Sequence, residues 1–252
     1  MQTLRLYLEA IDGDWFGWME TFPGAYSQGA TPEEATQAAP DALGDYLRWL
    51  RIHDEPLPAH LQGLTRLDFR VEVVETYRTH RAASGLEING FFAPDERPLD
   101  EEDLERYFRL LNHARADMRK ALRPLPPEAF HTAPFGAKPV CDILRHVAEK
   151  ELFSLSCLRL KPEIPTSDDC VGLLEAARRE FERAIRAMPE HKRGEVFTVQ
   201  GERWSLRKAL RRALWHERYH AAQIEARSNP VAFLRSLAVV DARHREHNVH
   251  AW

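Results

Sequence analysis

The sequence predicts an α+β, multi-domain chain in which a small α/β sheet-and-helix module precedes an all-α four-helix bundle. Near the start of the chain, apolar and polar residues alternate as they do in a strand. Beyond about residue 95, apolar residues recur at helical spacing in four stretches of similar length. With 252 residues, 44% of them hydrophobic, the chain can bury the core of one large domain or of two ordinary ones.

The first elements form a predicted hairpin. The alternation over residues 4–8 indicates a strand with one buried face. Asp12-Gly13-Asp14 is typical of a turn, and residues 15–20 are expected to be the returning strand. Strand character appears again over residues 69–74.

A helix is predicted between these strands. Thr31 is a good N-cap, Pro32 suits the first helical position, and Glu34 is placed to close a capping box with Thr31. Apolar residues then continue at helical spacing to Leu50. Pro40 is expected either to kink this helix or to be tolerated near its first turns.

The hairpin, the Pro-Gly turn and the helix entry Gly29-Ala-Thr-Pro-Glu-Glu-Ala35 together resemble the HicB-like family. The resemblance covers roughly the first third of the chain, so residues 1–95 are taken as a HicB-like α/β module. It implies a helix packed on a small antiparallel sheet. Members of that family are often antitoxins, but no ribbon-helix-helix or helix-turn-helix unit follows here. We therefore expect an accessory or dimer-forming module.

Residues 96–228 are predicted to form the bundle, after a junction at residues 89–98. The expected helices run from a cap at Asp100 to Pro124, from near Pro139 to Pro162, from near Asp168 to Pro189, and from a cap at Ser205 to about Arg227. Residues 198–204 are expected to be a short extended piece. Residues 229–252 are predicted to form a short apolar helix and a polar tail.

The net charge and the hydropathy of the chain limit the classes of binding partner that we expect. A net charge of −4 argues against broad phosphate binding, so no nucleic acid is expected. The cationic residues of the fourth helix are predicted to be a solvated face: Arg207, Lys208, Arg211 and Arg212. There is no apolar run that could span a bilayer and no secretory signal pattern, so we expect a cytoplasmic protein without membrane contact. Cys141, Cys157 and Cys170 lack C-x-x-C spacing and are expected to be reduced thiols.

Histidines give the best indication of chemistry. His216 and His220 are four residues apart in a helical stretch, so both imidazoles can reach one metal ion, and His146 lies in another helix. With 12 histidines, about one such pair is expected by chance, so the spacing alone decides little. The pair continues an apolar stripe that faces the core. Two interpretations follow: a shared zinc, nickel or iron ion, or core histidines that bond to Glu149, Glu217 or backbone carbonyls.

Both helix motifs resemble the DinB / YfiT-like four-helix family. One histidine lies in Asp142-Ile-Leu-Arg-His-Val-Ala-Glu149, and the pair lies in His216-x-x-x-His220-x-x-Gln223-Ile224. The similarity runs from about Leu99 to Arg227. It implies a divalent metal ion held by His146, His216 and His220, with water in the remaining positions.

Glu149, three residues after His146, is the candidate catalytic residue, as a carboxylate that orients water near the ion. The alternative is a solvent-facing side chain paired with Arg145.

By the resemblance, we expect a metal-dependent transferase or hydrolase. The first hypothesis is a thiol S-transferase-like enzyme that uses a low-molecular-weight thiol on small electrophiles. The expected partners are a small-molecule substrate and, as in relatives, a second copy of the chain. The alternative is a non-catalytic metal-binding stress protein whose HicB-like module binds another protein.

Overall fold

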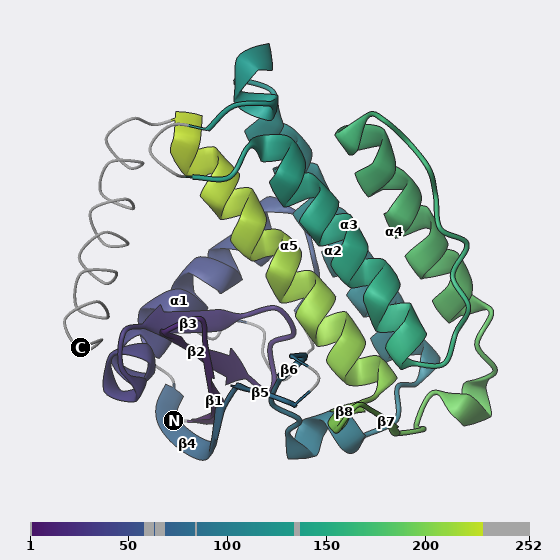
Figure 1. Ribbon diagram of the computed structural model, residues 1–252. Coiled ribbons are helices and arrows are strands. Elements are labelled where there is room, and N and C mark those ends of the chain that lie inside the picture. Colours follow the sequence, from purple (N-terminus) through teal and green to yellow (C-terminus); the bar gives the residue numbers. More distant parts are fainter. Residues whose placement is uncertain (1, 58–62, 64–68, 84, 134–136, 229–252) are drawn as a thin grey trace, which may run out of the picture.

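A computed structural model describes residues 2–57, 63, 69–83, 85–133 and 137–228 (Figure 1). A small sheet with one helix lies against a group of four long helices, which confirms the mixed α+β class. The tail predicted over residues 229–252 lies outside the described residues. Among the described helices, none combines the length and the apolar character needed to cross a membrane.

The sheet has four strands in the order β3-β2-β1-β4. β1 (Gln2–Ile11) and β2 (Asp14–Met19) form the predicted antiparallel hairpin, and β3 (Tyr26–Gly29) pairs antiparallel with β2. β4 (Phe69–Arg78) runs parallel to β1 at the sheet edge, where strand character was predicted. β3 was not predicted, because four residues are too few to show an alternation.

Helix α1 (Pro32–Ile52) begins at Thr31, as predicted. The Thr31 hydroxyl accepts a hydrogen bond from the Glu34 amide at 3.1 Å. The Glu34 carboxylate, however, accepts from the amide of Ala30 at 2.8 Å, so the expected reciprocal bond is displaced by one residue. The helix continues without a break through Pro40, which lies inside it rather than in its first turn, so the carbonyl of Thr36 receives no hydrogen bond from the backbone nitrogen of residue 40.

Four further helices confirm the predicted helical part: α2 (Glu101–Leu122), α3 (Val140–Cys157), α4 (Cys170–Arg186) and α5 (Leu206–Ser228). α5 packs against α2 and α3, and α4 packs against α3 (Figure 1). The caps at Asp100 and Ser205 lie where they were expected. Two short hairpins complete the described fold: β5 (His80–Arg81) with β6 (Glu87–Ile88), and β7 (Phe197–Val199) with β8 (Glu202–Trp204).

The expectation that β1 has only one buried face is wrong. Its leucines pack toward α1, but Tyr7 and Glu9 on the other face are buried as well. This second face lies against α5, where Phe16 and Trp18 of β2 contact the Trp215 ring at centroid distances of 5.2 and 5.1 Å. The sheet is therefore enclosed between α1 and the bundle, and a sequence period cannot reveal this second cover.

Consecutive residues of α5 serve different neighbours. Trp215 packs on the sheet, and His216 meets His146 of α3. Glu217 bonds to guanidinium groups of α2 and α4. Arg218 donates to the carbonyl of Gly24 and lies over aromatic rings of α1. A helix turns by about 100° per residue, so these side chains leave α5 in all directions.

The cationic face predicted to be solvated is instead covered. Lys208 is fully buried, and its ammonium group donates to the Glu202 carboxylate at 2.8 Å. Burial lowers the pKa of Lys208 to about 8. Arg211 donates to both oxygens of Asp95, at 3.0 and 2.8 Å. The reason is that the segment before α2 and the β7–β8 hairpin pack over this end of α5, which the helical pattern alone could not show.

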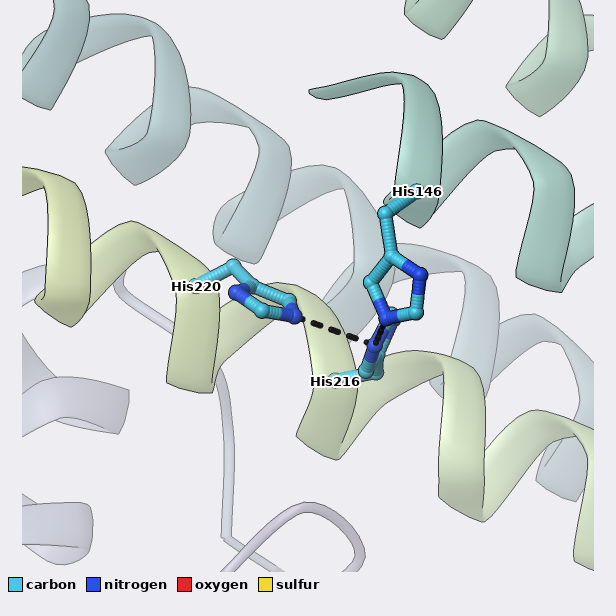
Figure 2. Close-up of side chains that lie close together, drawn as sticks. All are labelled: His146, His216 and His220. Carbon is cyan, nitrogen blue, oxygen red and sulfur yellow. Dashed lines mark hydrogen bonds between the residues drawn. The ribbon is translucent and has the colours of Figure 1, made fainter. Parts of the chain in front are cut away.

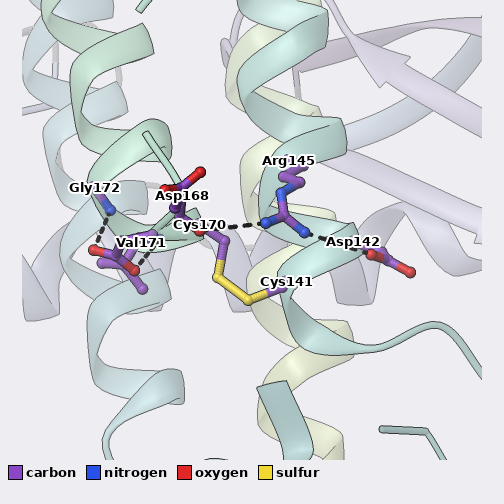
Figure 3. Close-up of a disulfide and its surroundings, with 8 residues drawn as sticks. Cys141, Asp142, Arg145, Asp168, Cys170, Val171 and Gly172 are labelled. Atoms are coloured by element: carbon purple, nitrogen blue, oxygen red, sulfur yellow. Dashed lines mark hydrogen bonds and ion pairs between the residues drawn. A yellow bond between two sulfur atoms is a disulfide. The ribbon is translucent and has the colours of Figure 1, made fainter. Parts of the chain in front are cut away.

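A disulfide joins Cys141 in the first turn of α3 to Cys170 in the first turn of α4 (Figure 3). This corrects the expectation of three reduced thiols. The missing C-x-x-C spacing does not exclude a bond between cysteines 29 residues apart, and the packing of α3 on α4 brings them together. Cys157 is a free, buried thiol. The bridge ties the helix that carries His146 to its neighbour.

Candidate metal centre

The three predicted histidines converge (Figure 2). Nε2 of His216 lies 3.0 Å from Nε2 of His146 across the α3–α5 contact and 3.1 Å from Nε2 of His220 on its own helix. Ligand atoms of all three lie within 4.8 Å of one another, and within the described ranges this is the one such group of three or more His, Cys, Asp or Glu residues. The geometric part of the expectation is therefore met.

These spacings fit one shared ion. Imidazole nitrogens bind zinc at about 2.0–2.1 Å, so two of them on one ion with bond angles of 90–110° are separated by about 2.9–3.4 Å. The two observed separations fall in that range. An ion bound to His216 and to either of the other two histidines thus fits these separations, and the third ligand atom lies within 4.8 Å of both.

Hydrogen bonding also prepares the site. Nδ1 of His220 lies 2.8 Å from Oε1 of Gln223, and an amide oxygen only accepts. His220 therefore carries its proton on Nδ1, and its Nε2 turns a lone pair toward Nε2 of His216. An outer partner of this kind fixes the tautomer and orientation of a metal ligand. Gln223, noted in the sequence only as part of a motif, is such a partner.

The environment keeps all three imidazoles neutral. Burial lowers the pKa of His216 well below its ordinary value, and the neighbouring His220 and His146 lower it further. Burial lowers the pKa of His220 to about 4. The pKa of His146 is lowered by burial and then by the charges of Lys150 and Lys138. Neutral nitrogens are the form that binds a metal, so protons compete weakly here at neutral pH.

A cavity of about 410 Å³, here called the histidine cavity, adjoins the cluster. Its lining includes His146 and His216, but not His220. The opposite wall comes from the sheet module, through the β1–β2 turn at Asp12 and the β5–β6 hairpin at Arg81. Lys150 of α3 and Arg212 of α5 also line it. The site is therefore open to a small molecule, between the bundle and the amino-terminal module.

Other sequence candidates lie outside this group. Glu149 is exposed, and its charge raises the pKa of His146 against the larger effect of burial; its catalytic role stays a prediction. His113 of α2 stacks on His53 at a centroid distance of 4.6 Å, and its Nε2 lies 3.3 Å from the Glu55 carboxylate.

A buried charge network, not predicted from the sequence, joins all four bundle helices. Arg115 (α2), Glu151 (α3), Arg178 (α4) and Glu217 (α5) are each at most 5% exposed in their side chains. Arg178 donates to both carboxylates, and Arg115 donates to Glu217. A signal was available: Glu151 lies four residues from Val147 and from Leu155, on the apolar stripe of its helix. A charged residue in such a position needs a buried partner.

Comparison with known proteins adds the following findings. Residues 110–224, which include all three histidines, match the family model of the DinB superfamily. Among solved structures, YfiT from Bacillus subtilis is similar, with 19% identity, a TM-score of 0.40, and coverage of 54% of this chain and 90% of that one. It is described as a probable metal-dependent hydrolase with an unusual four-helix bundle topology. No curated protein shows a significant match.

Proposed function

We propose that this protein is a divalent-metal-dependent enzyme that transforms a small electrophilic molecule in the histidine cavity. One observation carries the proposal: three neutral imidazoles turn Nε2 atoms toward a common point beside a cavity. The match of residues 110–224 to the family model of the DinB superfamily supports it, because the resemblance to that family implies a metal ion at these histidines. A volume of about 410 Å³ lies within the range of small-molecule sites.

The residues have separable roles in this proposal. His146, His216 and His220 hold the ion, and Gln223 keeps His220 in the required tautomer. A bound divalent ion supplies Lewis-acid chemistry, which lowers the pKa of water toward ~7 or stabilises a thiolate. Lys150 and Arg212 supply positive charge that can orient an anionic group of the substrate. The sheet module closes the cavity and limits the size of the substrate.

The finer proposal concerns the nucleophile. Water leads to hydrolysis, whereas a low-molecular-weight thiol leads to S-transfer, the activity inferred from the sequence resemblance.

Zinc-, nickel- and iron-loaded samples should be assayed with 4-nitrophenyl acetate, and with 2-mercaptoethanol plus 1-chloro-2,4-dinitrobenzene. His146→Ala is the matched control. A reaction that the wild type accelerates and the variant does not supports an enzyme. Acceleration with 4-nitrophenyl acetate identifies water as the nucleophile, and acceleration with 1-chloro-2,4-dinitrobenzene identifies the thiol. Elemental analysis of protein purified without a metal-affinity tag identifies the native ion.

A non-catalytic role is the competing outcome. A metal ion bridging His146 to His216 would tie α3 to α5 and so stabilise the fold. If His146→Ala loses the metal and melts earlier, while neither probe reacts faster with the wild type than with the variant, the ion is structural and the proposed enzyme is wrong.

A further inference from the structure

Glu151 is a buried carboxylate in the wall of the histidine cavity. It lies on α3, five residues beyond His146, and its side chain is only 2% exposed. Oε1 accepts hydrogen bonds from Arg178, with a distance of 2.9 Å to Nε. Oε2 is also buried, but it has no hydrogen-bond partner among the described residues. A buried carboxylate oxygen without a partner is costly and calls for a ligand or a role.

Glu217 provides the contrast within the same network. Its Oε1 accepts from Arg115 and its Oε2 accepts from Arg178, so both oxygens are used. Glu217 does not belong to the lining of the histidine cavity. The two carboxylates share a guanidinium group, but only Glu151 combines a spare oxygen with a place in the cavity wall.

We propose that Glu151 is the proton acceptor of the histidine cavity. As the nucleophile attacks, its O–H or S–H bond breaks, the proton passes to Oε2, and the oxygen or sulfur forms a bond to the electrophilic carbon. The bond from that carbon to the leaving group then breaks, and Glu151 returns the proton to the leaving group. Nucleophile and substrate thus give product and protonated leaving group, and Glu151 ends as it began. This assignment rests on the proposed function.

The surroundings suit this role. Three charged side chains face Glu151: Arg178 of α4, Arg115 of α2 and Glu217 of α5. Nη2 of Arg115 lies 3.6 Å from Oε1 of Glu151. Burial raises the pKa of Glu151, and the two guanidinium groups oppose this rise without cancelling it. At Glu217, burial acts in the same direction, but Arg178 and Arg115 lower its pKa below the ordinary value. A carboxylate with a raised pKa is the better base near neutral pH.

The test compares Glu151→Gln with Glu217→Gln, which removes the same charge from the same network. In zinc-loaded protein, Glu151→Gln should hydrolyse 4-nitrophenyl acetate about 10²–10⁴-fold more slowly, the usual contribution of a positioned base, while zinc content stays that of the wild type. Glu217→Gln should lose at least as much thermal stability but much less rate. A Glu151→Gln rate within threefold of the wild type would overturn the proposal. So would an equal loss of rate in both variants.

A second variant and a binding measurement test Glu151 if Glu151→Gln does not fold or if the wild type is inactive. If Glu151→Gln does not fold, Glu151→Asp retains the charge but withdraws the oxygen by one methylene, and an unchanged rate in that variant contradicts the proposal. If the wild type accelerates neither the hydrolysis nor the thiol reaction, the proposed function fails, and calorimetry still tests Glu151. Because a nearby cation lowers the pKa of a carboxyl group, zinc binding should release more protons from the wild type than from Glu151→Gln at some pH between about 4 and 8. Equal release at every pH in that range argues against a place for Glu151 at the site.

Discussion

The histidine cluster and the charge network are neighbours on α5, yet they are built in opposite ways. His216 belongs to the first and Glu217 to the second. The network contains two guanidinium groups and two carboxylates, so its charges balance within the protein. The cluster brings together three imidazole nitrogens, and burial lowers the pKa of each of these histidines. The network is thus an ionic brace between the four helices, with Oε2 of Glu151 as its one carboxylate oxygen without a hydrogen bond among the described residues, whereas the cluster is completed by a metal ion under the proposed function.

Breaking the brace should have the largest effect. Arg178→Met leaves Glu151 and Glu217 buried with one guanidinium group between them. We expect the free energy of unfolding to fall by about 3–5 kcal/mol, as measured by urea denaturation, because a buried charge then lacks its partner. Arg119→Met, which removes an exposed pair with Glu175, is the control and should cost less than about 1 kcal/mol. Equal losses in both would show that the network is not a brace.

Breaking the cluster should act on metal binding instead. His216→Ala removes the central nitrogen, and we expect zinc affinity to fall by more than about 100-fold, since loss of an outer partner alone costs about 10–100-fold. Competition with a chelating dye measures this affinity. His113→Ala, which alters a histidine outside the cluster, should bind zinc like the wild type. Retained affinity in His216→Ala would remove the basis for a shared ion.

The pH dependence of stability sharpens the same contrast. In the zinc-free protein the pKa of His220 is about 4, against about 6.5 when unfolded. Between these values the unfolded chain binds more protons, so the free energy of unfolding should decrease as pH falls from 6.5 to 4, by up to about 3 kcal/mol from this residue. Urea denaturation at pH 7 and 4.5 measures the decrease. In His220→Gln it should be smaller, and an identical decrease would contradict the assignment.

The smallest expected effect concerns Gln223. Gln223→Ala removes the acceptor that holds the His220 proton on Nδ1. We expect a roughly tenfold loss of zinc affinity, as is common for an outer partner, with the fold unchanged. The dye competition described above measures it, and circular dichroism checks the fold. Affinity within twofold of the wild type would mean that the tautomer is set by the other rings.

The sequence was sufficient where a signal is local or repeated. Caps at Thr31, Asp100 and Ser205 located helix starts, and two helical motifs located three converging histidines. It failed where distant segments meet. The burial of Lys208 depends on Glu202 and a loop from before α2, and the Cys141–Cys170 bridge depends on helix packing. No period in one segment encodes which other segment covers it.

The side chains from Trp215 to Arg218 point in different directions around α5, and this limits insertions and deletions in the helix. Deleting or inserting a single codon upstream in α5 would rotate every later side chain by about 100°. The sheet, the His146 ring, the ionic brace and the helix α1 would then each meet the wrong residue at once. A substitution in this helix changes one of these contacts, whereas a change in its length between Leu206 and His220 changes all of them together.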